Sequence, residues 1–115
     1  MAKATTEPVK VMAPIAAPSA IDVHIFKGQG VPAYSAFEGF TDGGETLAGV
    51  LTDRGITELD VVGIATDHCI RASALDALGE GLTVNVIAGL AVGVAPESSI
   101  AAIGAIVAAG GNIIL

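Results

Sequence analysis

Short β-prone runs alternate with helical stretches along most of this chain, and this alternation limits the folds that it can adopt. Runs rich in β-branched residues predict strands, and apolar residues spaced three or four apart predict helices. In chain order the expected elements are strand 21–26, helix 45–54, strand 60–66, helix 67–80, strand 83–87, helix 97–109 and strand 112–115. Strands joined through helices imply right-handed crossovers, and therefore a three-layer, doubly wound parallel α/β sheet.

The amino-acid composition limits the kinds of binding partner and the cellular compartment that we expect. Of 115 residues 52% are apolar, only 15% are charged, and the mean hydropathy is +0.72. Much apolar surface must therefore stay outside the core, which predicts a homo-oligomer or a partner chain. The net charge of -7 opposes binding to nucleic acid. The chain has one cysteine and so no internal disulfide, which fits a reducing, cytoplasmic location.

Two regions need a separate interpretation. Residues 1–20 are rich in Ala, Pro and Thr, and we expect an irregular tail there. Residues 98–115 form the longest uncharged run, but Gly110 and Gly111 interrupt it. The remaining apolar helix is shorter than the roughly 20 residues that a bilayer span needs, so we expect no membrane span.

Two reactive side chains fall at the carboxyl ends of expected strands, where parallel sheets gather their chemistry. Lys27 ends the first strand, and Cys69 is the third residue after Thr66, the expected N-cap of the next helix. Unpaired backbone N–H groups and the positive end of the helix dipole favour a thiolate there, as would a neighbouring ammonium group. We therefore expect Cys69 to be a nucleophile with Lys27 beside it. The alternatives are a buried, inert cysteine and a solvated lysine.

Other candidate residues are ambiguous when taken alone. Tyr34 and Phe37 lie in the glycine-rich loop 28–44, where they either line a pocket or fill the core. His68 is more typical of a surface histidine than of a catalytic base. The glycines of this loop do not form a phosphate-binding fingerprint.

Several segments together resemble a known family. Residues 59–71 read Leu-Asp-Val-Val-Gly-Ile-Ala-Thr-Asp-His-Cys-Ile-Arg, and shorter matches occur at 26–28, 33–39, 74–77 and 93–97. This pattern resembles the nicotinamidase and pyrazinamidase branch of the isochorismatase-like cysteine hydrolases. The resemblance covers about residues 21–115, which we expect to form the hydrolase domain.

The resemblance implies roles for particular residues. Cys69 looks like the nucleophile that attacks a carboxamide carbon and releases ammonia through a thioester, and Lys27 looks like the lysine of the catalytic triad. The peptide bond between Ile64 and Ala65 resembles the cis peptide of the family, which aims the N–H groups of Ala65 and Cys69 at the oxyanion. Positions similar to pocket-lining ones are Tyr34, Ile64 and His68.

The chain also departs from the family pattern. The family places its triad aspartate and its zinc- or iron-binding Asp and His residues on strands before the lysine strand, but residues 1–20 contain neither Asp nor His. Asp22 begins the lysine strand and is expected at the opposite edge of the sheet, and Asp67 is part of the matched motif rather than an obvious base. We therefore expect a sheet that lacks the first strands, an edge covered by another chain, and no metal or other cofactor held by this chain.

The combined prediction is a hydrolase that converts a small aromatic carboxamide, nicotinamide, to nicotinate and ammonia through a cysteine thioester. Because the triad aspartate of the family has no counterpart here, two alternatives stay open: another chain supplies the missing strands, or this short chain is a truncated hydrolase whose rate is lower by several powers of ten. The alternative is a non-catalytic fragment or assembly subunit of the same fold. A third possibility keeps the fold but changes the reaction to cleavage of a vinyl ether or an N-carbamoyl group. Cys69 argues against the vinyl-ether branch, which can work without a cysteine nucleophile.

Overall fold

The computed structural model describes residues 2–3, 8–9, 11–12, 23–28 and 34–115. The strands are β1 (Ala2–Lys3), β2 (Pro8–Val9), β3 (Val11–Met12), β4 (Val23–His24), β5 (Glu58–Ile64), β6 (Thr83–Val92) and β7 (Asn112–Ile114). The helices are α1 (Leu47–Asp53), α2 (Arg71–Gly79) and α3 (Pro96–Ala108), together with a 3₁₀ turn η2 (Ala36–Glu38) and a π-helical turn η3 (Thr66–Ile70).

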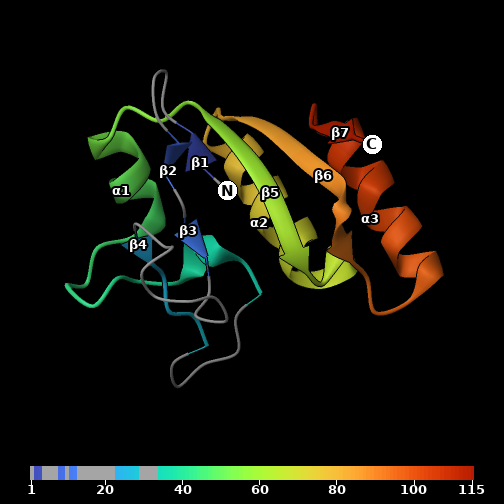
Figure 1. The fold of residues 1–115 in the computed structure, drawn as a ribbon, viewed down its shortest axis with the longest axis horizontal. Helices are drawn as coiled ribbons and strands as arrows, with labels where there is room; N and C mark the ends of the chain where they lie inside the picture. The colour runs from blue at the N-terminus through green and yellow to red at the C-terminus, as the bar shows by residue number, and fades with distance from the viewer. Residues whose placement is uncertain (1, 4–7, 10, 13–22, 29–33) are drawn as a thin grey trace.

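The main sheet has the order β2-β1-β5-β6-β7, and its β5, β6 and β7 strands are parallel. Helices α2 and α3 pack behind these strands (Figure 1). The core between the helices and the sheet is made of side chains that are almost completely buried, namely Ala74, Ala77, Val84, Val86 and Ile106. The predicted parallel α/β sheet with flanking helices is therefore confirmed.

Local signals set the ends of the helices. The Thr46 hydroxyl accepts the N–H of Gly49 at 3.1 Å and caps α1, and Gly55 follows the helix with a φ of +66°. Gly81 follows α2 with a φ of +83°. Both glycines adopt the left-handed conformation that commonly ends helices and that glycine reaches without a steric penalty.

The start of the second helix differs from the prediction. Thr66 is the first residue of η3 rather than an N-cap, and Ala65, which precedes it, makes no side-chain capping bond. The turn is wide because Ile70 donates its N–H to the Ala65 carbonyl at 2.9 Å, an i to i−5 bond. The regular helix α2 begins only at Arg71.

The strand expected at residues 21–26 does not join the main sheet. Within it, Val23–His24 forms β4, which pairs in parallel with β3 as a separate two-stranded sheet. Phe26 instead exchanges two backbone hydrogen bonds with Phe40, at 2.9 and 3.0 Å. Lys27 therefore does not follow a strand that pairs with β5.

The described parts of residues 1–20 form short paired strands, whereas the sequence predicts an irregular tail there. Strand β1 runs antiparallel to β5, with Ala2 opposite Leu59 and Lys3 opposite Glu58. Among the described residues, the ladder between β1 and β5 consists of these two pairs. Only the beginning of the β5 edge is thus covered by β1.

Strand β6 is longer than the predicted strand 83–87. Its pairing with β5 shifts between Val61 and Gly63, so that β6 bulges and then pairs again, with Ile64 opposite Val92. A bulge inserts residues on one strand without ending the ladder, which hydrophobic alternation alone does not reveal. The bulge extends the sheet to the point where η3 begins.

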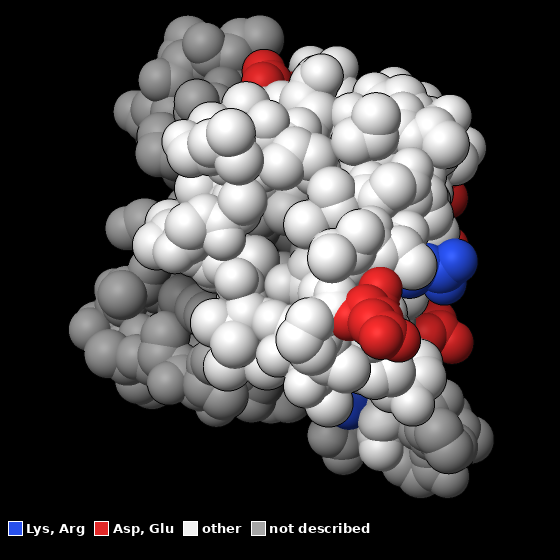
Figure 2. Space-filling view, turned by 90° about the vertical axis from the view of Figure 1, so that its right-hand side faces the viewer, with Lys and Arg blue, Asp and Glu red and all other residues white. Residues whose placement is uncertain are grey.

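The spacing of Ile100, Ile103 and Val107, which predicts helix 97–109, does not mark the buried face of α3. Ala102 and Ile106 face the core, whereas Ile100 is 72% exposed and Val107 is 52% exposed. From Ile100 to its end this helix consists of apolar residues and one glycine, so several stripes fit the helical period and the sequence does not select one. Figure 2 looks onto the side of the molecule where α3 lies, and few charged side chains appear there. Among the described residues, no helix combines the length and hydropathy needed to cross a membrane.

Candidate active site

The turn η3 leaves the carboxyl end of β5 and carries Asp67, His68 and Cys69. The peptide bond between Ile64 and Ala65 is cis, in agreement with the expectation from the resemblance. The Ala65 carbonyl accepts the N–H groups of His68 at 3.1 Å and Ile70 at 2.9 Å. Cys69 has a free, partly buried thiol.

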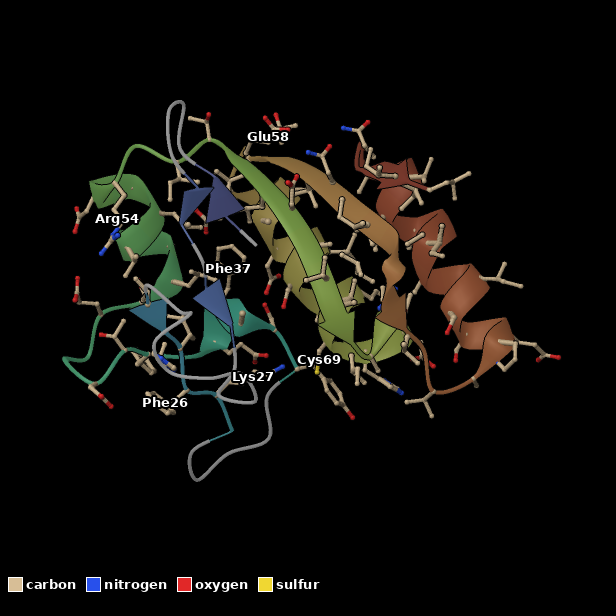
Figure 3. The ribbon with its side chains drawn as sticks, in the orientation of Figure 1. Phe26, Lys27, Phe37, Arg54, Glu58 and Cys69 are labelled. Carbon is tan, nitrogen blue, oxygen red and sulfur yellow. The ribbon has the colours of Figure 1, made fainter. Side chains whose placement is uncertain are left out.

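A chain of contacts links Lys27 to the turn that carries Cys69. The Lys27 ammonium donates to the backbone carbonyl of Tyr34. The ring of Tyr34 stacks on the ring of His68, with centroids 5.3 Å apart and an interplanar angle of 27°. In the view of Figure 3, the side chain of Lys27 points toward Cys69. The loop of Lys27 and Tyr34 therefore meets η3 although β4 is not a neighbour of β5.

A capping box holds the Tyr34 loop in place. The Ser35 hydroxyl accepts the N–H of Phe37 at 3.1 Å, and the Glu38 carboxylate accepts the N–H groups of Ser35 and Tyr34 at 3.0 and 3.2 Å. Sequence reasoning missed this feature, although a serine followed three residues later by a glutamate is its signal.

A second bond anchors the same loop to the cysteine-bearing segment. The N–H of Ala36 donates to the Ser73 hydroxyl at 2.9 Å, and Ser73 lies in α2, four residues after Cys69. Residues four apart in a helix lie on the same face, one turn from each other. The loop is thus docked directly beside the turn that carries the thiol.

Phe37 lies with the core rather than beside Cys69. Its side chain packs against the buried cluster and lines a cavity of about 40 Å³ together with residues of α1 and the end of α2. Of the two alternatives for this residue, the structure favours filling the core over binding a substrate.

The Asp67 carboxylate is hydrogen-bonded to the loop after β6 and to the first turn of α3. It accepts the N–H of Val94 at 2.9 Å, the N–H of Ala95 at 3.1 Å and the hydroxyl of Ser98 at 2.5 Å. The Ser98 hydroxyl first, and then the Val94 N–H, hold the pKa of Asp67 well below its usual range. The carboxylate is therefore ionised and already bound, so Asp67 is a poor candidate for the general base.

The imidazole of His68 lies beside this carboxylate. Its Nε2 lies 4.0 Å from Asp67 Oδ2, and its side chain is 45% exposed. The imidazole thus lies between the buried Asp67 and the exposed ring of Tyr34. It presents an accessible aromatic and polar surface on the turn that carries Cys69.

Exposed apolar side chains lie at the same end of the sheet. Ile64 and Val92 face each other across the β5–β6 ladder, and both are mostly exposed, as is Leu90. An apolar surface of this kind suits either an aromatic ligand or another protein segment.

The described residues do not fit a metal site. Among residues 23–28 and 34–115 and the short pieces before them, no three His, Cys, Asp or Glu side chains are arranged to hold a metal ion. Asp22, whose position at the opposite edge was expected, lies outside the described residues. The expectation that this chain holds no metal stays a prediction.

Comparison with known proteins supports one family. The isochorismatase domain model matches residues 9–115. The chain is 46% identical over 85 residues to the nicotinamidase/pyrazinamidase of Mycobacterium tuberculosis, which covers 74% of this chain and 46% of that protein. It is 38% identical over 78 residues to the nicotinamidase of Escherichia coli, covering 64% of this chain and 36% of that protein.

Solved structures give the same result. The pyrazinamidase of Pyrococcus horikoshii in complex with zinc superposes with a TM-score of 0.65 and 37% identity, over 72% of this chain and 44% of that chain. PnC1 from L. infantum in complex with nicotinate superposes with a TM-score of 0.67 and 29% identity, over 80% of this chain and 46% of that chain. This chain spans less than half the length of each of these relatives.

Proposed function

Because this chain belongs to the isochorismatase domain family, we propose that it is a nicotinamidase-type amide hydrolase in which Cys69 is the nucleophile. The observation that supports this most is the contact chain from Lys27 through Tyr34 and His68 to the turn of Cys69. It brings the loop of a cationic side chain to the turn that carries a partly buried thiol, and a nearby cation favours the thiolate that nucleophilic catalysis by cysteine uses.

The reaction takes place in two balanced steps. The sulfur of Cys69 bonds to the carboxamide carbon, the carbon–nitrogen bond breaks, and the thiol proton leaves with the nitrogen as ammonia. Water then adds to the thioester, the carbon–sulfur bond breaks, and the carboxylic acid and the thiol are released. The N–H groups of Ala65 and Cys69 are the proposed donors to the oxyanion in both steps.

The surroundings suit a small aromatic amide. The rings of Tyr34 and His68 are stacked and partly exposed, and Ile64 adds an apolar surface at the end of β5. Flat aromatic and apolar surfaces next to a few polar groups are typical of sites for small heteroaromatic ligands. Nicotinamide is therefore the proposed substrate, and nicotinate the product.

Ammonia release tests the proposal. Wild-type protein and the Cys69→Ala and Cys69→Ser variants are incubated with nicotinamide, and ammonia is followed with a coupled assay. We expect release by the wild type alone, together with an acyl adduct on Cys69 that intact-mass spectrometry detects in the wild-type protein after a rapid acid quench. Equal ammonia release from wild type and Cys69→Ala would refute the assignment.

The second candidate is a non-catalytic assembly subunit of the same fold. The exposed Ile64, Leu90 and Val92 favour it, because apolar surface of this kind promotes association. Light scattering coupled to size-exclusion chromatography gives the oligomeric mass, and titration with a thiol reagent gives the reactivity of Cys69. An oligomer that has an unreactive thiol and releases no ammonia would support this candidate over the hydrolase.

A further inference from the structure

We propose that Asp67 is a positioning residue for Cys69, which locks the cysteine-bearing turn to the loop that begins α3. This inference rests on the proposed function, because it assigns to Cys69 the role of nucleophile. It assigns to Asp67 a role in the site that is neither that of a base nor that of a ligand.

The contacts of Asp67 join two segments that are far apart in the sequence. Its side chain is 1% exposed, and its two oxygens accept hydrogen bonds from Val94, Ala95 and Ser98. Ala95, the N-cap of α3, makes no capping bond with its own side chain. A carboxylate at the start of a helix is stabilised by the helix dipole, so Asp67 supplies this charge from another element.

A close backbone contact locks the same two segments independently. A Cβ built on Gly93 would lie 1.8 Å from Ser99 Oγ and 3.5 Å from Thr66 Cβ. The backbone at Gly93 thus packs tightly against Ser99 of α3, and Thr66 of η3 lies close by. The turn therefore has little room to rotate while the Asp67 hydrogen bonds are intact.

The orientation of Asp67 determines the direction of Cys69. Successive residues in a helix are rotated by about 100°, so side chains two positions apart point to nearly opposite sides. Asp67 points toward α3, which leaves Cys69 on the side where Lys27 lies (Figure 3). Loss of the Asp67 bonds would free η3 to rotate and move the sulfur away from this side.

Two variants weaken the hydrogen bonds of Asp67 in different ways. Asp67→Asn keeps the shape but places an amide N–H₂ against backbone donors, and Ser98→Ala removes one donor and leaves the carboxylate in place. Thr46→Ala is the matched control, because it removes one side-chain hydrogen bond at the start of a helix, α1, that is remote from the thiol. Circular dichroism and thermal unfolding establish that each variant is folded.

Two measurements report on the thiol itself. The rate of Cys69 alkylation by iodoacetamide does not depend on turnover, and ammonia release from nicotinamide gives kcat and KM separately. We expect Asp67→Asn and Ser98→Ala to slow alkylation and to lower kcat by about tenfold or more, since small misplacements of a reacting group have effects of this size. KM should change much less than kcat, and Thr46→Ala should change neither rate.

The outcomes separate this inference from the proposed function. If the wild type releases no ammonia, the hydrolase assignment fails, and the alkylation rates still decide whether Asp67 positions the thiol. If Asp67→Asn does not fold, the alkylation rate of Ser98→Ala alone decides whether Asp67 positions the thiol. Folded variants that alkylate at the wild-type rate would overturn the role of Asp67, whether or not the protein is a hydrolase.

Discussion

Replacing Gly93 with alanine is expected to destabilise the protein for a steric reason alone. Gly93 is not among the glycines with a positive φ, so alanine meets no backbone penalty there. Its Cβ would lie 1.8 Å from Ser99 Oγ and 2.9 Å from Ser99 Cβ, whereas carbon atoms in contact are about 3.5–4.0 Å apart. Rotation of the Ser99 side chain relieves the first overlap but not the second. Overpacking of this kind costs about 1–3 kcal/mol.

Urea denaturation followed by circular dichroism measures this cost. With a denaturant slope of about 2 kcal/mol per molar, a loss of about 2 kcal/mol lowers the midpoint by about 1 M. Ser99→Ala removes a buried hydroxyl that has no hydrogen-bond partner among the described residues. The substitution should therefore be neutral or stabilising by itself, and it should recover part of the loss in the double variant.

Gly89→Ala is the matched control in β6, the strand that ends one residue before Gly93. A Cβ at Gly89 meets nothing within 4 Å, and its φ is not positive. Its effect should stay within about 0.5 kcal/mol. The steric reasoning is refuted if Gly93→Ala unfolds at the same urea concentration as the wild type, or if the effects of Gly93→Ala and Ser99→Ala are simply additive.

Three further predictions concern other parts of the fold. The folded-state pKa of Asp67 lies below its ordinary value of 3.8. The ionised carboxylate therefore stabilises the folded state above that pH, and this stabilisation is lost as the pH falls toward the folded-state pKa. The melting temperature of Asp67→Asn should consequently fall less on acidification than that of the wild type. Ile106→Ala should cost about 2–5 kcal/mol in urea unfolding, whereas Ile100→Ala, on the exposed face of α3, should cost less than about 0.5 kcal/mol. Val92→Ser should lower the oligomeric mass in light scattering and leave the urea midpoint unchanged, and an unchanged mass would exclude this surface from any oligomer interface.

The parts of the fold that could be predicted are those with local causes. Helix 45–54 was expected from its apolar stripe and from Gly55, and α1 occupies residues 47–53 with that glycine just beyond it. The strand at 60–66 and the helix at 97–109 were likewise placed within about two residues of β5 and α3. In each case, the periodicity and the terminating residue lie within the element itself.

The parts that were missed depend on partners distant in the sequence. Nothing in residues 21–26 indicates that β4 pairs with β3 instead of joining the main sheet. The extension of β6 depends on a bulge that lets it pair again with β5. The buried face of α3 is decided by what packs against Ala102 and Ile106, because a helix that is apolar on all sides has no face that its own sequence distinguishes.

The site shows the same division between local and distant causes. The position of Cys69 in the first turn after a strand could be read from the sequence, whereas the partners of Asp67 lie 27 to 31 residues further along the chain. The sequence shows the motif segments 59–71 and 93–97 as two separate matches to the family. In the structure, hydrogen bonds from the backbone of Val94 and Ala95 to Asp67 join the two segments. Each segment therefore needs the other: the carboxylate stabilises the start of α3, and the loop keeps the turn of Cys69 from rotating. A substitution in either segment should consequently alter the behaviour of the thiol, even where it touches neither Cys69 nor Lys27.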